Sequence, residues 1–237
     1  MSCIVHREPG LLVVDDLLPT AGFRQVCREV AHGDYRSVHA QKWDKAWRLW
    51  DGQPLRGESV YFDPRGAFGW TGATYPTRTF VDALVDAVRL AAAASPDIAG
   101  TEGADWIALH LSPWLYPVGS ALALHQDAGR YSGAFAYFAH ARWHPHWGGD
   151  LLVSPPVPPG TPPVDAPRAP DGTDDEPWIS EDAPAEPGDP GIATCVSPGP
   201  NRLVLLGADR PHRIARVDPN AGAHVRASIA GFFLRAP

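Results

Sequence analysis

The C-terminal half of the chain is a succession of short apolar segments separated by turn residues, and this pattern constrains the fold most. Short segments in which apolar and polar residues alternate are typical of strands in an antiparallel sandwich or barrel. They begin at Trp106, and we expect strands at residues 106–111, 121–127, 134–138, 149–153, 192–196, 201–206, 212–217 and 224–234.

The N-terminal half predicts one strand and two helices. The sequence LLVVDDLL, at residues 11–18, indicates a strand and a turn, after which Pro19-Thr20 opens a helix with apolar residues at helical spacing. A second helix is expected over residues 79–94, because Ser95-Pro96 follows it. Helices followed by an all-β run predict a mainly β (α+β) fold, a jelly-roll or two-sheet barrel with N-terminal helices packed on its outer face.

An acidic, proline-rich insert at about 154–191 interrupts the strands. Residues 154–200 hold 14 of the chain's 26 prolines, and nine acidic residues against one basic residue. So many prolines exclude a regular element. We interpret the insert either as a solvated loop or as a lid that attracts a positively charged substrate, with Trp178 as its apolar contact. Residues 1–237 are otherwise expected to form a single domain.

Composition excludes several classes of function. No apolar run approaches the roughly 20 residues of a membrane helix, and the first ten residues lack the pattern of a secretion signal, so we expect a cytoplasmic protein without a membrane partner. The net charge is −7 and no basic stripe is present, which argues against nucleic acid as a partner. The three cysteines show no pairing that predicts a disulfide framework or a thiolate zinc site. The oligomeric state is left open.

Two histidines and one aspartate form a candidate metal site. The triplet His125-Gln126-Asp127 ends a predicted strand, and alternation places its histidine and aspartate on the same face. His212 follows the apolar strand at 201–206, and a closed sheet can bring it to the same place. Two imidazoles and one carboxylate on one face of an octahedron are the ligand set of non-haem Fe(II) sites. Because an H-x-D triplet also occurs by chance, the assignment needs support from other residues of the chain.

A candidate carboxylate-binding arginine lies after the second histidine. Residues 213–217, a turn at 218–222 and a strand from His224 are interpreted as a hairpin, which places Arg226 and Ser228 at i and i+2 on one face. An arginine beside a hydroxyl presents a fork of hydrogen-bond donors that fits a carboxylate.

This ordered set resembles the Fe(II)/2-oxoglutarate-dependent dioxygenases, and within them the prolyl-hydroxylase-like branch. The resemblance covers roughly residues 11–234 and rests on VVDDLLP, WLYPVGSALALHQD, WGGDLLV, PNRLVLL, RPHRI and HVRASIAGFF. It implies a double-stranded β-helix in which the two histidines and the aspartate are the catalytic iron ligands. It also implies that Arg226 and Ser228 bind the distal carboxylate of 2-oxoglutarate. Tyr116 looks like a further contact with this co-substrate, although a core aromatic residue is nearly as good an interpretation.

The same resemblance implies the chemistry. Fe(II) would be the cofactor, with 2-oxoglutarate and O2 as co-substrates, and decarboxylation to succinate and CO2 would drive oxidation of a C–H bond. Hydroxylation, desaturation and ring closure all remain open outcomes. Halogenation is not expected, because halogenating relatives lack a carboxylate where this chain has Asp127.

The primary substrate is predicted only as a class. We expect a small polar metabolite, for example a cationic natural product such as an aminoglycoside-type antibiotic intermediate. Candidate substrate contacts are Arg130, Tyr131, Trp43 and Trp178, with the histidines of HARWHPHWGG as weaker candidates. One alternative is a peptidyl or protein prolyl hydroxylase. Another is a cupin-like metal-binding barrel without redox chemistry, although the usual cupin pattern of H-x-H with a later Glu and His is absent.

Overall fold

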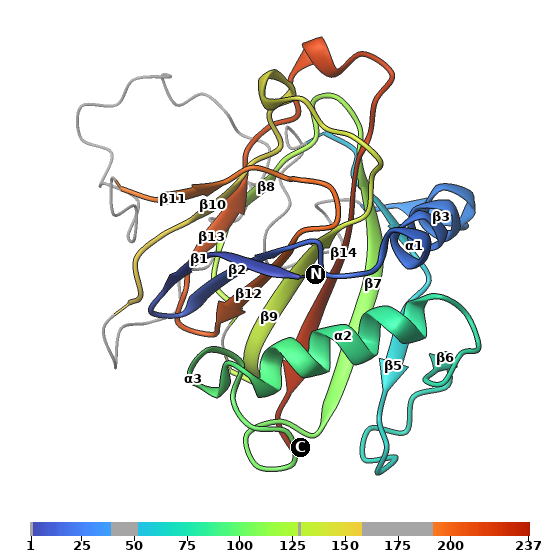
Figure 1. The fold of residues 1–237 in the computed structure, drawn as a ribbon, viewed down its shortest axis with the longest axis vertical. Helices are drawn as coiled ribbons and strands as arrows, with labels where there is room; N and C mark the ends of the chain where they lie inside the picture. The colour runs from blue at the N-terminus through green and yellow to red at the C-terminus, as the bar shows by residue number, and fades with distance from the viewer. Residues whose placement is uncertain (1, 39–51, 128, 158–191) are drawn as a thin grey trace, which may run out of the picture.

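The computed structural model describes residues 2–38, 52–127, 129–157 and 192–237, and these residues form two sheets and a few helices (Figure 1). The helices are α1 (Thr20–His32), α2 (Val81–Ala93) and the short α3 (Pro96–Ala99), and two single 3-10 turns lie at Pro145–Trp147 and Pro219–Ala221. The mainly β fold that the sequence predicted is confirmed. None of the helices in the described ranges is long and apolar enough to cross a membrane.

The larger sheet forms the centre of the molecule. Its long strands are β9, β14 and β7, and β14 pairs antiparallel with both of the others. In spatial order the sheet contains β1 (Cys3–Glu8), β2 (Leu11–Asp15), β12 (Leu203–Gly207), β9 (Tyr131–Phe138), β14 (Arg226–Leu234), β7 (Ala108–Tyr116), β4 (Leu55–Gly57) and β3 (Tyr35–Ser37), while β5 (Val60–Phe62) pairs with β7 and β6 (Ala73–Thr74) with β5.

The smaller sheet faces the larger one and carries two of the candidate metal ligands. Its order is β11 (Thr194–Val196), β10 (Leu151–Val153), β13 (His212–Ile214) and β8 (Leu122–His125), all antiparallel. Side chains from both sheets, among them Phe138, Val204, Leu151 and Ile214, share one buried cluster. The two sheets therefore enclose a common interior.

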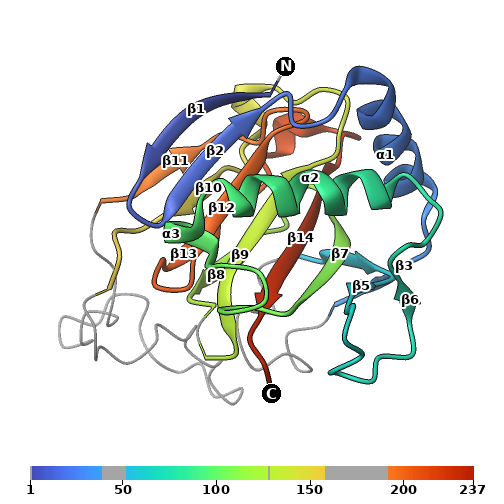
Figure 2. The same ribbon diagram turned by 60° about the horizontal axis from the view of Figure 1, so that its bottom comes forward.

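The outer face of the larger sheet is covered by helices. Figures 1 and 2 both show α2 crossing this sheet. Leu84 and Val88 of α2 are fully buried in one cluster with Leu109 and Leu111 of β7. Burying each such side chain contributes about 1.5–3 kcal/mol relative to leaving it exposed. Because side chains alternate along a strand, the residues between them, such as His110, face the other sheet.

Several sequence predictions about individual strands were wrong. The hairpin expected around residues 218–222 does not form, because β13 pairs with β10 and β8 whereas β14 pairs with β7 and β9. The strand expected at 121–127 ends at His125, so Asp127 lies beyond it. The strand expected to end at residue 111 continues to Tyr116. The short strands β1 and β3 to β6 were not predicted.

Candidate metal and carboxylate site

Three buried side chains converge between the sheets. His125 ends β8 and His212 begins β13, and the register of the smaller sheet pairs them directly. Asp127 lies two residues after His125, and its carboxylate oxygens lie 4.0 Å from His125 Nε2 and 3.5 Å from His212 Nε2. Ligand atoms from all three residues lie within 4.8 Å of one another. The structure thus brings together the three residues that the sequence selected.

Hydrogen bonds orient both imidazoles toward the same point. His125 Nδ1 lies 2.9 Å from the carbonyl oxygen of Ala123, and His212 Nδ1 lies 3.0 Å from that of Arg210. A carbonyl oxygen only accepts, so each Nδ1 carries the proton and each Nε2 of the neutral ring presents a lone pair.

This donor set fits a divalent metal ion. Two Nε2 lone pairs and an ionised carboxylate repel one another unless a cation lies between them, and backbone-anchored imidazoles are the usual supports of a metal site. Two imidazoles and one carboxylate would hold Fe(II) on one face and leave positions open for small ligands. Across the part of the chain that the structure describes, no other group of three histidine, cysteine, aspartate or glutamate side chains is placed to hold a metal.

Arg226 is a buried cation at the other end of the same interior. It is 1% exposed, and its Nε donates to the carbonyl oxygen of Gly149 at 2.7 Å while its Nη1 donates to Ser228 Oγ at 3.2 Å. The rings of Tyr116 and Phe138 both have their centroids 4.9 Å from its Cζ. Burial lowers the pKa of Arg226 to about 10, partly offset by Tyr116 and Asp150. The guanidinium still remains charged at neutral pH.

A glycine allows the Arg226 side chain to lie where it does. Gly149 has a φ of +71°, and a Cβ atom there would lie 2.8 Å from Cδ of Arg226. Within the described ranges Arg226 makes no ion pair with a carboxylate. A buried cation that has no carboxylate partner is strongly stabilised when an anionic ligand binds beside it. Arg226 and Ser228 thus lie side by side as predicted, although both belong to β14 and no hairpin is involved.

A cavity of about 330 Å³ connects the arginine to the three metal-binding side chains. This volume is within the range of small-molecule sites. Alanines 134, 136 and 230 leave space in its wall. The lining also includes Arg56, His110, Ser112, Trp114, Tyr116, Leu122, His125, Asp127, Arg130, Tyr131, Leu151, Leu206, His212, Ile214, Arg226, Ser228 and Phe232.

The residues predicted to contact substrate have different locations. Arg130 is exposed and Tyr131 buried, and both line the cavity, with Arg130 Nε donating to the Tyr131 hydroxyl at 3.0 Å. Tyr116 also lines the cavity, beside Arg226. Trp43 and Trp178 lie outside the described residues, as does most of the proposed lid.

The histidines of HARWHPHWGG do not line the cavity. His140 is buried, with Nε2 2.7 Å from the carbonyl oxygen of Pro198 and Nδ1 3.2 Å from the backbone nitrogen of Ala227. Burial lowers its pKa to about 4, so the ring is neutral and ties the strand ends together. His144 and His146 are exposed at the turn Pro145–Trp147.

Sequence reasoning missed the polar residues on the inner face of β7. His110, Ser112 and Trp114 line the cavity together with Tyr116. Their alternation with Leu109 and Leu111 was the available signal, but the strand expected at residues 106–111 ended before Ser112. Arg56 of β4 was missed because β4 is short and comes after a stretch without clear periodicity.

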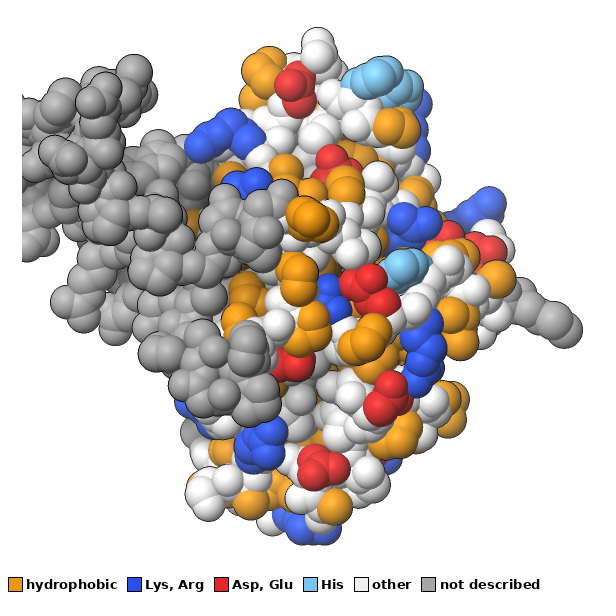
Figure 3. Space-filling view, turned by 90° about the vertical axis from the view of Figure 1, so that its left-hand side faces the viewer, with side chains coloured by type: hydrophobic (Ala, Val, Ile, Leu, Met, Phe, Trp, Pro, Cys, Tyr) orange, Lys and Arg blue, Asp and Glu red, His pale blue; other side chains and the backbone are white. Residues whose placement is uncertain are grey.

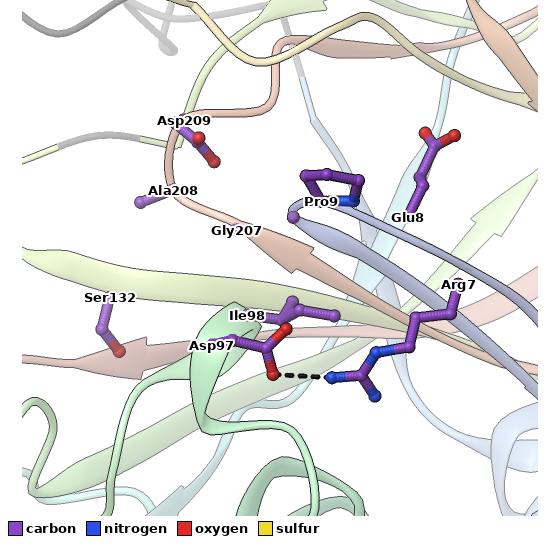
Figure 4. Close-up of a pocket in the computed structure, with 10 residues that line it drawn as sticks. Arg7, Glu8, Pro9, Asp97, Ile98, Ser132, Gly207, Ala208 and Asp209 are labelled. Atoms are coloured by element: carbon purple, nitrogen blue, oxygen red, sulfur yellow. Dashed lines mark hydrogen bonds and ion pairs between the residues drawn. The ribbon is translucent and has the colours of Figure 1, made fainter.

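The outer surface offers no comparable site among the described residues. A hollow of about 660 Å³ lies beside the β1–β2 turn and α3, where Arg7 and Asp97 form an ion pair at 2.7 Å (Figure 4). Its lining carries no histidine and no cysteine. On the face shown in Figure 3, basic, acidic and hydrophobic side chains intermingle instead of gathering by charge.

Comparison with solved structures identifies the fold. A Pseudomonas putida prolyl-4-hydroxylase superimposes with a TM-score of 0.55 at 18% identity, over 95% of this chain and 92% of that chain. A Trichoplax adhaerens prolyl hydroxylase, in complex with a hypoxia inducible factor peptide fragment, gives 0.60 at 13% identity, over 96% and 84%. The epimerase SnoN, in complex with Fe3+, alpha ketoglutarate and nogalamycin RO, gives 0.50 at 16% identity, over 96% and 80%.

These likenesses show that the chain has the jelly-roll fold of the 2-oxoglutarate-Fe(II) oxygenases, as the sequence resemblance implied. Neither a family model nor a curated protein sequence matches the chain.

Proposed function

We propose that the protein is an Fe(II)- and 2-oxoglutarate-dependent oxygenase that oxidises a C–H bond of a small polar molecule. The observation that carries the proposal is a single cavity that contains both the His125–Asp127–His212 group and the buried guanidinium of Arg226. A metal-binding barrel without redox chemistry has no use for a buried carboxylate anchor beside its metal. The fold, shared with oxygenases, supports the same conclusion.

The residues that would hold the metal and the co-substrate have defined tasks in this proposal. When bound, iron supplies the activation of O2 that couples decarboxylation of 2-oxoglutarate to oxidation of the substrate. The two histidines and Asp127 hold the metal, and Arg226 with Ser228 binds the distal carboxylate of the co-substrate through charge-assisted hydrogen bonds. Leu122, Leu151 and Ile214 line the cavity with apolar surface, which excludes water and strengthens these contacts.

The identity of the primary substrate is less constrained. A small metabolite is supported by SnoN, whose structure contains nogalamycin RO. The alternative, a peptidyl prolyl hydroxylase, is favoured by two structural neighbours, one of them in complex with a peptide. Succinate formation stimulated by proline-containing peptides would select this alternative.

Other parts of the sequence prediction stay predictions. The cationic substrate was inferred from the acidic insert at 154–191, and residues 158–191 lie outside the described structure. We also propose that residues 1–237 form one oxygenase domain that carries this insert.

The proposed function is tested by the spectrum of the anaerobic protein with Fe(II) and 2-oxoglutarate. A weak visible charge-transfer band is expected, and His125→Ala, Asp127→Ala and His212→Ala should each abolish it. The exposed histidine variant His144→Ala serves as the matched control and should retain it. A full-strength band in a variant of the group would remove that residue from the ligand set, and no band in the wild-type protein would overturn the proposal.

A further inference from the structure

A second group of polar side chains lines the cavity at the edge of the larger sheet. Arg56 Nη2 donates to Ser59 Oγ at 2.7 Å and to Ser112 Oγ at 3.1 Å, and it lies 3.2 Å from His110 Nε2. The Nε of Arg56 also lies 3.3 Å from Ser112 Oγ. These contacts hold the guanidinium against the cavity that contains the metal-binding group.

A second guanidinium belongs to the same region. Arg130 lines the cavity, and its Cζ lies 5.2 Å from the centroid of the Tyr131 ring. Burial lowers the pKa of His110 to about 4, and the charges of Arg56 and Arg130 add to the effect. Arg56 contacts His110 directly, Arg130 lines the same cavity, and His110 is neutral at neutral pH.

Aromatic rings form a wall beside this group. Phe232 stacks on Tyr131 with centroids 4.5 Å apart, and the ring of His110 lies 6.1 Å from that of Phe232. Tyr61 stacks on His110 at 5.1 Å and Trp70 on Tyr61 at 4.4 Å. The His110 and Phe232 rings are thus supported from behind and offer an apolar surface next to the arginines.

The charge of the cavity wall points to one class of substrate. The described lining contains three arginines and one carboxylate, and that carboxylate is Asp127 of the metal group. Arg226 is assigned to the co-substrate. Arg56, which is half-buried, and Arg130, which is exposed, are two further guanidiniums of the described lining, and both attract an anion.

We propose that Arg56, His110 and Arg130 bind a carboxylate of the primary substrate, whose apolar part lies against Phe232 and Tyr131. The inference rests on the proposed function, because it takes the metal-containing cavity as the place of oxidation. It narrows the substrate to a small carboxylic acid. It also departs from the cationic metabolite predicted from the acidic insert, since two guanidiniums repel a cation.

Benzoate and benzamide provide a matched pair of probes, because they share a ring and differ in charge. Their affinities are measured by calorimetry on the protein loaded with Zn(II) and saturated with 2-oxoglutarate. The co-substrate then occupies Arg226, and the probes can bind only elsewhere in the cavity. Benzoate should bind at least tenfold more tightly than benzamide, as expected for a charge-assisted contact. This comparison uses the wild-type protein alone and does not depend on the folding of a variant.

Variants then locate the site. Arg56→Gln should weaken benzoate binding about tenfold and leave benzamide binding unchanged, because it removes one charge-assisted partner. Arg56→Lys should keep part of the preference, since it keeps the charge but loses the fork. Arg24→Gln, at an exposed position of α1, removes the same charge away from the cavity and should have no effect.

Two outcomes of these measurements would overturn the carboxylate site, and a third would separate it from the proposed function. Equal affinities for benzoate and benzamide overturn the carboxylate site. Competition between benzoate and 2-oxoglutarate also overturns it, because benzoate then occupies the Arg226 end. If 2-oxoglutarate does not bind but benzoate is still preferred and depends on Arg56, the proposed function fails and the carboxylate site stands.

Discussion

Arg226→Met removes the proposed co-substrate anchor and replaces it with an apolar side chain that can fill much of the same space. The guanidinium is 1% exposed, so its contact with a carboxylate is made away from water. Deleting one partner of a buried charged pair costs about 2–5 kcal/mol, and each 1.4 kcal/mol is a factor of ten. The dissociation constant of 2-oxoglutarate should therefore rise by roughly 30-fold to several thousand-fold.

The same change should affect the stability of the ligand-free protein much less. Burial lowers the pKa of Arg226 from 12.5 to about 10, so holding the charged form in the interior costs on the order of 3 kcal/mol, which methionine relieves. Against this, the carbonyl oxygen of Gly149 loses its partner, which costs about 1–3 kcal/mol. The two terms oppose each other, and we expect the free energy of unfolding to change by less than about 2 kcal/mol.

The assay is a titration of 2-oxoglutarate into Zn(II)-loaded protein, with thermal unfolding measured in its presence and absence. Arg213→Met, an exposed position on β13 outside the cavity lining, is the control and should bind normally. A dissociation constant for Arg226→Met within threefold of wild type would refute the assignment. The anchor would then be sought at Arg216, since Arg202 already pairs with Asp15 at 2.6 Å.

Three further predictions concern individual contacts. Gly149→Ala should lose about 1–2 kcal/mol of stability because φ is +71°, and should weaken 2-oxoglutarate binding by displacing Arg226; unchanged binding in a titration would contradict this. His140 has a pKa of about 4 when folded and about 6.5 when unfolded, so its stability contribution is complete above pH 6.5 and lost as the pH falls toward 4. Chemical denaturation should show a shallower acid loss for His140→Gln, and identical pH profiles would count against it. Ala230→Phe should fill the cavity and abolish 2-oxoglutarate turnover, measured as succinate, while circular dichroism stays native; retained turnover would place the reaction elsewhere.

The sequence by itself determined the two longer helices and the choice of candidate metal ligands. The period of apolar residues predicted the helices near residues 20–32 and 79–94 to within a few residues, because periodicity is a property of neighbouring positions. His125, Asp127 and His212 could be selected from the sequence because two imidazoles and one carboxylate are a recognisable ligand set for a metal ion. Arg226 and Ser228 shared a face because side chains alternate along any strand.

Only the tertiary structure decided which strands pair and therefore which side chains share the cavity. Sequence proximity predicted that β13 and β14 form a hairpin, but each pairs with strands far away in the chain.

Pro113 shows the same limit within one strand. It lacks an N–H, and it lies between the part of β7 that pairs with β5 and the part that pairs with β4, where no strand pairs with that edge among the described residues. The strand can therefore continue through it. Arg56 and His110 meet at this edge although 54 positions separate them in the sequence. No local period records such a contact, because it depends on how distant strands are placed beside one another.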